Sequence, residues 1–466
     1  MSAPPKKLSP FACDRAMQSA TRPAGDIVRG SGDEKAGVQA EATVGDGAVH
    51  SQDKPGRSWL CLIERFCRHL LRKNLQHIAF GEVVIEHGEN SERFGNLETT
   101  ELMGHVQVHS PKFYRRTVTG GALGSAESYL EGEWDSDDLT DLFCVLLRNE
   151  QALQSFRSSM FSVSGVVSQL EHFRNRNSRH GSQRNIHEHY DLGNAFFSLF
   201  LDPTMMYSSA LFPSEQTSLE GASIEKVDRV CRTLQLKPHD HVIEIGTGWG
   251  TFAIHAASRY GCKVTTTTIS EEQFRLATLR IADLGLSDKI TVLKNDYRDL
   301  TGKYDKLVSI EMIEAAGKQY LPEYFATCDR LLKNDGAMVI QAITMPEQRY
   351  ARYKNSVDFI QKYIFPGGFL PSISAMQSCV ATNSSLRMLG LHEFGLHYAR
   401  TLRLWNERFH ERLDDVRGQG FNDRFIRMWR YYLCYCEAAF LERAIGVVQV
   451  LWAKPGSSLG TVGSGE

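Results

Sequence analysis

The chain has 466 residues, 42% hydrophobic and 23% charged, and its 53 basic and 55 acidic side chains leave a net charge of -2. That length suffices for about three domains and a large core. The near-neutral charge offers no basic field for nucleic acid, and no apolar run approaches the ~20 residues of a membrane helix. Met1–Gly56 lacks the pattern of a secretory signal. Ten cysteines without a CxxC pair or a His/Cys cluster predict reduced thiols, a cytoplasmic location and no metal site.

The first part of the chain is expected to hold a disordered segment and then a small domain. Residues 1–57 are rich in Gly, Ala, Ser, Asp and Lys, which predicts disorder. Residues 58–165 are expected to form a smaller α+β domain. Its first segment, Trp59–Leu75, spaces apolar residues three and four apart and predicts an amphipathic helix, which either lies on a membrane surface or, more commonly, packs on its own domain. Alternating segments then predict strands at Gly81–Glu86, His105–His109 and Phe113–Val118.

A basic stretch separates this domain from the rest of the chain. Residues 166–190 are expected to form a linker, within which Glu171–His189 carries four arginines and four histidines against two glutamates. A solvated linker is the more common outcome for such a sequence. The alternative is an arm that contacts anionic phospholipid headgroups, where each cation contributes roughly 1 kcal/mol.

The second half of the chain alternates buried strand candidates with helical patterns. Three predicted helices are Thr251–Tyr260, Glu271–Leu284 and Lys318–Leu332. The alternation predicts βαβ units and a doubly wound, parallel, Rossmann-like sheet over residues 191–455. Gly446–Ala453 predicts one more strand, and residues 456–466 are expected to form a flexible tail. The five earlier strand candidates are HVIEIGTGWG, CKVTTTTIS, KITVLKND, KYDKLVSIE and AMVIQAIT.

A glycine-rich turn closes the first strand of this half. Gly246, Gly248 and Gly250 form a GxGxG pattern, and such glycines let a ligand approach the main chain. A purely structural tight turn would give the same pattern. However, Glu244 precedes the glycines and Asp296 closes the third strand candidate. Together they fit S-adenosylmethionine, with the glycines under its amino-acid part and a carboxylate at the adenine amino group.

The end of the second strand argues against a nicotinamide cofactor. Dinucleotide enzymes commonly carry an Asp or Glu there, to bind the ribose hydroxyls. This chain has Thr268-Ile269-Ser270 instead. The pattern therefore favours S-adenosylmethionine over NAD.

The chain resembles a known family, the cyclopropane-fatty-acyl-phospholipid synthases with their mycolic-acid methyltransferase relatives. The resemblance runs from about Phe80 to Ala453 and rests on many blocks in the same order. These are GGALGSAESYLEGEW, HEHYDLGNAFF, MMYSSALF, EIGTGWG, TISEEQ, NDYRDL, EMIEAAG, YIFPGGFLPS, HYARTLRLW and YYLCYCEAAF. The resemblance implies a class I S-adenosylmethionine-dependent methyltransferase fold and a transferase acting in lipid biosynthesis.

The implied reaction transfers a methylene group from S-adenosylmethionine to the double bond of an unsaturated phospholipid acyl chain, forming a cyclopropane fatty acid. Two alternatives stay open, a methyl-branched fatty-acid product and a non-catalytic lipid-binding role. The implied reaction needs an apolar tunnel, aromatic faces to stabilise a carbocation, and one well-placed base. The implied partner is unsaturated phospholipid in a membrane surface, with the protein peripheral to the membrane; a homodimer is left open.

The resemblance also implies further cofactor contacts beside the glycine turn. They are Tyr207 and Ser208, which would close over the cofactor, Thr268, Ser270 and Gln273, near the ribose and methionine ends, and Asp296 and Tyr297, which would flank the adenine.

In the resembled family the proton acceptor is a bicarbonate ion, held by a glutamate, a tyrosine, a histidine and a segment that bears a cysteine. Glu314 and Tyr398 match the first two, whereas Ser209 and Gln341 stand where many members have cysteine and histidine. Serine and glutamine still donate hydrogen bonds to an anion. Because these two residues differ from the family pattern, both a cyclopropane product and a methyl-branched product stay open. Cys436 matches a family cysteine sometimes assigned an active role, although a cysteine among aromatics is more often a packing residue.

Overall fold

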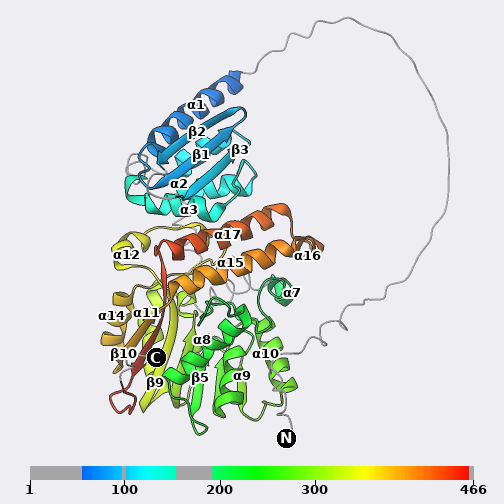
Figure 1. Cartoon of the computed structure of the whole chain (residues 1–466). Coiled ribbons are helices and arrows are strands. Elements are labelled where there is room, and N and C mark those ends of the chain that lie inside the picture. The colour runs from blue at the N-terminus through cyan, green and yellow to red at the C-terminus, as the bar shows by residue number, and fades with distance from the viewer. Residues whose placement is uncertain (1–54, 97–100, 154–191, 461–466) are drawn as a thin grey trace, which may run out of the picture. The chain divides into compact units, whose positions relative to one another are not determined.

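The computed structural model describes residues 55–96, 101–153 and 192–460. The linker expected at 166–190, with its basic stretch, lies outside the described residues, and so does most of the segment expected to be disordered. From Glu64 onward the described residues form one compact unit, which contains a four-stranded and a seven-stranded sheet (Figure 1).

The smaller sheet has the strand order β2-β1-β3-β4, with β1 antiparallel to β2 and parallel to β3. It confirms the predicted α+β character of the first domain. Its elements are α1 (Pro55–Leu75), β1 (Gly81–His87), β2 (Asn90–Asn96), β3 (Met103–Val108), α2 (Lys112–Leu130), β4 (Trp134–Asp135) and α3 (Leu139–Arg148).

Two predictions for this domain need correction. Helix α1 begins at Pro55, inside the stretch predicted to be disordered, and proline is well suited to a first helical position. The segment Phe113–Val118 is the start of helix α2 and not a strand. Its buried side chains include Tyr114 and Val118, and this separation of four residues puts them on one face of a helix but would also put them on one face of a strand.

Helix α1 packs on its own domain and leaves an apolar edge exposed. Cys67, Leu71 and Leu75 recur every four residues and are buried in the core. The neighbouring side chain of Phe66 is 60% exposed. The more common of the two alternatives for this helix is thus the one observed. Among the described residues no helix combines the length and apolar character needed to cross a bilayer.

The larger sheet has the order β10-β11-β9-β8-β5-β6-β7. The strands β5 to β9 pair in parallel, as predicted, whereas β11 runs antiparallel to both neighbours, so the sheet as a whole is mixed. The sequence missed β10, an edge strand whose side chains are largely exposed or half-buried. The strands are β5 (His241–Ile245), β6 (Lys263–Thr267), β7 (Ile290–Leu293), β8 (Tyr304–Ile310), β9 (Leu332–Thr344), β10 (Arg387–Glu393) and β11 (Gly446–Ala453).

Helices flank this sheet, with α11 and α14 beside β10 and with α8, α9 and α10 grouped near β5 (Figure 1). The three predicted helices are present, the last of them with a short 3-10 turn at its start. The helical elements are α7 (Gly193–Phe197), α8 (Leu219–Thr233), α9 (Thr251–His255), η1 (Ala256–Tyr260), α10 (Glu271–Asp283), η2 (Tyr297–Asp299), η3 (Ile313–Ala315), η4 (Lys318–Tyr320), α11 (Leu321–Leu331), α12 (Glu347–Tyr353), α13 (Phe359–Tyr363), α14 (Ile373–Asn383), α15 (Gly395–Glu411), α16 (Leu413–Gly418) and α17 (Asp423–Leu441).

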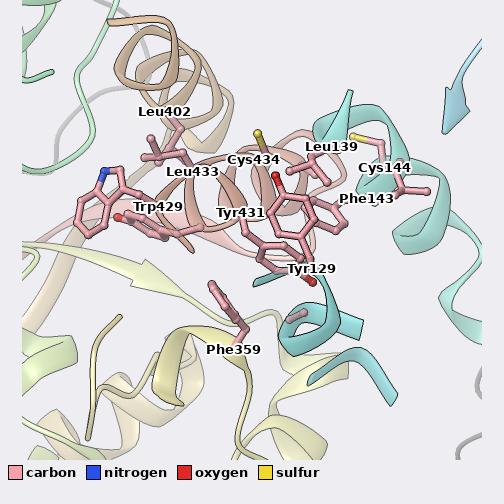
Figure 2. Close-up of a cluster of buried hydrophobic side chains, with 14 of the residues drawn as sticks. Tyr129, Leu139, Phe143, Cys144, Phe359, Leu402, Trp429, Tyr431, Leu433 and Cys434 are labelled. Atoms are coloured by element: carbon pink, nitrogen blue, oxygen red, sulfur yellow. The ribbon is translucent and has the colours of Figure 1, made fainter. Parts of the chain in front are cut away.

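Helix α17 joins the core of the small domain to the core above the large sheet. Figure 2 shows rings from both parts gathered around Tyr431. Its ring centroid lies 5.5 Å from that of Tyr129, 4.9 Å from that of Phe143 and 4.5 Å from that of Phe359. Aromatic pairs at these distances add to the stabilisation that burial provides. The small domain is therefore a packed part of the same body and holds one face of α17 in place.

Candidate active site

A cavity of about 1440 Å³ opens beyond the carboxyl ends of β5, β6, β7 and β8. In α/β sheets of this kind, ligands bind where the strand order reverses, which here is between β5 and β8. Typical small-molecule pockets measure roughly 300–1,000 Å³. The cavity is therefore large enough for a nucleoside cofactor together with a second, extended molecule.

The glycine turn after β5 lines this cavity, and its three glycines have positive φ angles of 100°, 52° and 87° at Gly246, Gly248 and Gly250. A Cβ atom at Gly246 would lie 2.7 Å from Cγ of Met312, so this glycine is needed for packing. A Cβ atom at Gly248 would meet no protein atom within 4 Å. No protein atom therefore covers the main chain of Gly248 on the side where a Cβ atom would stand, and a ligand in the cavity can approach it closely.

Beneath the turn lies a buried charge cluster. Glu244 accepts a hydrogen bond from the Thr266 hydroxyl at 2.7 Å, and burial raises its pKa to about 8. The ammonium of Lys226 is buried and donates to the Ser208 hydroxyl at 2.6 Å; burial lowers the pKa of Lys226 to about 8 although Glu311 opposes the shift. Ser208 is thereby fixed at the cavity wall.

The residues after β6 divide into two groups. Thr268 and Gln273 line the cavity, and the Thr268 hydroxyl donates to Oε1 of Gln273 at 2.8 Å. Ser270 is not among the lining residues; its hydroxyl accepts from the backbone N–H of Gln273 and caps helix α10. The structure therefore places two of these three predicted residues at the cavity and gives Ser270 a local structural role.

Asp296 and Tyr297, after β7, both line the cavity. The Asp296 carboxylate is shared with Arg298, which donates to Oδ1 from Nε at 2.8 Å and to Oδ2 from its terminal nitrogen at 2.6 Å. The Tyr297 ring packs on Tyr324, and its buried hydroxyl has no hydrogen-bond partner among the described residues. An unpartnered buried hydroxyl at a cavity wall is a site where a ligand can bind.

Aromatic side chains form another part of the cavity wall. The Tyr207 hydroxyl lies 3.0 Å from that of Tyr432, and its ring lies 5.3 Å from that of Trp405. Cys436, on α17, lines the same wall, and burial raises the pKa of its thiol. A neutral thiol is a poor nucleophile, which favours a lining role for Cys436.

The residue at the centre of the site is one the sequence reasoning missed. Glu311, directly after β8, accepts hydrogen bonds from three groups: the backbone N–H of Ser209 at 2.9 Å and the Gln341 amide at 2.7 Å, both at Oε1, and the Tyr398 hydroxyl at 2.7 Å, at Oε2. The three donating residues were predicted to surround an anion. The structure brings them together around a carboxylate of the chain itself.

Glu314 lies beside this cluster and also lines the cavity. Its Oε1 accepts from the backbone N–H of Ile343 at 2.5 Å, whereas its buried Oε2 has no partner among the described residues. Burial and the neighbouring charge of Glu311 raise the pKa of Glu314 to about 8. Burial also raises the pKa of Glu311, but Lys226 and the three donors oppose that rise. A pKa of about 8 keeps Glu314 largely protonated at neutral pH.

The substitution Glu314→Gln is expected to flatten the pH dependence of stability. The raised pKa means that the stability from neutral Glu314 is fully present below pH 4.5 and is lost as pH rises through about 8. Glutamine stays neutral and keeps an oxygen for the Ile343 N–H. Thermal melts should therefore give similar melting temperatures near pH 5 and a higher one for the variant near pH 9. If the melting temperatures of the parent and of the variant differ by the same amount at every pH from 5 to 9, Glu314 is ionised throughout this range.

The fold and the cavity define an S-adenosylmethionine-dependent methyltransferase, and comparisons with known proteins agree. The family model described as "Mycolic acid cyclopropane synthetase" matches residues 177–450. The chain belongs to this family, which includes the cyclopropane synthases. The chain is 40% identical over 350 residues to tuberculostearic acid methyltransferase UfaA1 of Mycobacterium tuberculosis, covering 73% of this chain and 81% of that protein.

Two further similarities bear on the cofactor and the fold. The chain is 36% identical over 352 residues to cyclopropane-fatty-acyl-phospholipid synthase of Escherichia coli, covering 75% of this chain and 87% of that protein. Its structure superposes on that of the mycolic acid cyclopropane synthase CmaA1 complexed with SAH and CTAB, with a TM-score of 0.55, 30% identity, and coverage of 58% of this chain and 98% of the other. The chain is thus an enzyme that uses S-adenosylmethionine, and the open main chain at Gly248 fits this cofactor.

Proposed function

We propose that the enzyme adds the methyl carbon of S-adenosylmethionine to the double bond of an unsaturated phospholipid acyl chain and closes a cyclopropane ring. One observation carries this proposal: the same cavity is lined by the glycine turn at Gly248, by the aromatic rings of Tyr207 and Tyr432, and by the hydrogen-bonded carboxylate of Glu311. A hydrophilic acceptor would not need such a wall.

S-adenosylmethionine, when bound, supplies an electrophilic methyl group. The cofactor would be held by the main chain at Gly248, by Thr268 and Gln273, and by Asp296 and Tyr297 at the adenine. The rings of Tyr207 and Tyr432 would face the cation that forms on the acyl chain, because an aromatic face attracts positive charge and excludes water.

A second candidate product is a methyl-branched fatty acid. The 40% identity to a tuberculostearic acid methyltransferase supports it, as do Ser209 and Gln341 at positions where many relatives have cysteine and histidine. Both candidates begin with the same methyl transfer to a double bond. They differ in the fate of the cation, which either closes a ring or shifts a hydride and then loses a proton to give an exocyclic methylene. A saturated methyl branch would form from that methylene in a separate two-electron reduction.

The decisive experiment is lipid analysis after incubation with vesicles. Vesicles of dioleoyl phospholipid and S-adenosylmethionine should give an acyl chain heavier by one CH₂ group, and proton NMR should show ring methylene signals. Vesicles of distearoyl phospholipid, which lack a double bond, serve as the control and should stay unchanged. An exocyclic methylene or a methyl branch would establish the second candidate. No change in the dioleoyl lipid would contradict both.

The proposed partner is the surface of a membrane, which an apolar edge of the small domain would contact. Phe66 on α1 is 60% exposed and Phe80, after α1, is 53% exposed; Phe80 also belongs to the cavity lining. Burying an exposed aromatic side chain in a membrane contributes about 1.5–3 kcal/mol. The double variant Phe66→Ser/Phe80→Ser should therefore sediment less with vesicles and turn over vesicle lipid more slowly, with unchanged affinity for S-adenosylmethionine.

A matched control is Leu279→Ser on helix α10, because Leu279 is 53% exposed but belongs to the other domain. It should change neither sedimentation nor turnover. If the double variant behaves like this control, another surface must contact the membrane.

A further inference from the structure

We propose that the proton acceptor in this enzyme is the carboxylate of Glu311, and that the enzyme needs no bicarbonate. The inference rests on the proposed function, because it assigns the base for that reaction. The family resemblance implies a bicarbonate ion held by Glu314 and Tyr398, with Ser209 and Gln341 as further donors. The three donating residues do not fit such an ion here, because each already donates to Glu311.

A carboxylate reproduces the shape and charge of the ion it replaces. Both are planar O–C–O anions that accept hydrogen bonds through two oxygens. The three donors use three of the roughly four acceptor positions of the Glu311 carboxylate, which leaves one free on Oε2. Because Glu311 lines the cavity, that position can receive a proton from a bound substrate.

The backbone at Glu311 supports a dedicated role. Its φ angle is +50°, a left-handed conformation that is uncommon outside glycine and costs on the order of 1–3 kcal/mol. The backbone N–H donates to the carbonyl of Gln341 at 2.8 Å, which helps to hold this conformation. Strain of this kind persists only where the surroundings enforce it, and it is concentrated at functional sites.

The groups around the carboxylate are themselves fixed. Oε1 of Gln341 accepts from the Gln449 amide at 3.0 Å, so the Gln341 nitrogen must face Glu311. The Tyr398 ring stacks on Phe440 with centroids 4.5 Å apart. A base that is held in one orientation before substrate arrives costs no reorganisation during the reaction.

The groups around this carboxylate favour its ionised form, against the effect of burial. The buried ammonium of Lys226 and the three donors oppose the rise in the pKa of Glu311 that burial causes, and the raised pKa of Glu314 keeps that neighbour largely neutral near pH 7. Three hydrogen bonds make the carboxylate a weak base. A C–H bond next to a carbocation is a strong acid, however, and a weak base at fixed geometry suffices to remove its proton.

The proposed step balances in atoms and electrons. After methyl transfer the acyl chain carries the new methyl group and a positive charge on the adjacent carbon. Oε2 of Glu311 takes one proton from the new methyl group, and the electrons of that C–H bond form the C–C bond that closes the ring. The proton stays on Glu311 until the product leaves and water re-enters the cavity.

The first test compares turnover with and without bicarbonate. In buffer stripped of carbon dioxide, wild-type turnover of dioleoyl vesicles should equal that in bicarbonate buffer. The variant Glu311→Gln keeps an oxygen for the donors but cannot take the proton, so its turnover should fall by about 10²–10⁴-fold. Its affinity for S-adenosylmethionine should not change. Wild-type activity that disappears without bicarbonate, or a Glu311→Gln variant with parental turnover, would overturn the proposal.

The second test makes the enzyme depend on an added anion. Glycine tolerates φ of +50°, so Glu311→Gly should keep the local backbone conformation and free the three donors, although it is expected to lose stability because the buried Lys226 ammonium loses a counter-charge. Bicarbonate or formate should then restore part of its turnover, with saturation. Gln235→Gly is the matched control, because exposed Gln235 also has φ of +50° and lies outside the cavity. It should keep parental turnover and show no response to either anion.

A binding measurement separates this proposal from the proposed function. ¹³C NMR of labelled bicarbonate should show line broadening with Glu311→Gly and none beyond background with wild type, whatever lipid the enzyme acts on. Equal broadening with both proteins would overturn the assignment of Glu311 even if the enzyme makes a cyclopropane. Failure of all vesicle lipids to react, with broadening confined to the glycine variant, would contradict the proposed function alone.

Discussion

Replacing Gly248 with valine is expected to abolish binding of S-adenosylmethionine while leaving a folded protein. The main chain at Gly248 is exposed to the cavity: a Cβ atom there would meet no protein atom within 4 Å, and a valine side chain would extend into the space of the ligand. We expect the dissociation constant to rise at least about 100-fold, equivalent to ~3 kcal/mol. Isothermal titration calorimetry with S-adenosylmethionine measures this directly.

The matched control for this variant is Gly285→Val. Gly285 follows helix α10, has φ of +65° and would also place a Cβ atom in open space, but it is not among the residues that line the cavity. Both variants should lose a similar 1–3 kcal/mol of stability, on the order of the cost of left-handed backbone for a β-branched residue. Only Gly248→Val should lose the cofactor; equal affinity in both variants would place the cofactor elsewhere.

The second large effect is expected from Lys226→Met, which removes a buried ammonium but keeps a side chain of similar length. Lys226 is fully buried, and its nearby charges are those of Glu311, Asp202 and Glu244. Removing one partner of a buried charge cluster typically costs ~3–5 kcal/mol, because the remaining charges are left uncompensated. Chemical denaturation should show this loss, whereas Lys263→Met, at the exposed start of β6, should stay within about 0.5 kcal/mol of the parent.

The same variant provides a functional readout that lost packing alone would not give. Without the ammonium, the pKa of Glu311 rises further and a larger fraction of Glu311 is protonated at neutral pH. The turnover deficit of Lys226→Met should therefore be larger near pH 7 than near pH 9. A deficit that does not vary with pH would assign Lys226 a purely structural role.

Much of the fold could be predicted because its signals are local. The strands β5 to β9 are largely buried runs of apolar and β-branched residues that end at polar or glycine residues, and the glycine turn marks the end of the first of them. The edge strand β10 carries no such run, since an edge strand is only partly covered. The start of helix α2 resembles a strand over six residues because Tyr114 and Val118 are four residues apart, a spacing that puts two side chains on one face of either a helix or a strand.

The site was predicted less completely, for a physical reason. The block EMIEAAG contains two carboxylates three residues apart, Glu311 and Glu314, and the family resemblance pointed only to the second. Which of them meets Tyr398 and Gln341 depends on the left-handed backbone at Glu311. That angle is set by long-range contacts with β9, such as the hydrogen bond to the Gln341 carbonyl, and no local pattern encodes it.

The most direct test of the central claim uses S-adenosylmethionine with a fully deuterated methyl group and dioleoyl phospholipid vesicles. If the methyl carbon is added to the double bond and one of its hydrogens is then removed by a base, mass spectrometry will find two deuterium atoms retained on the added carbon. This result holds for a ring and for an exocyclic methylene alike. Product that retains all three deuterium atoms, or label that appears only in the headgroup, would contradict the account.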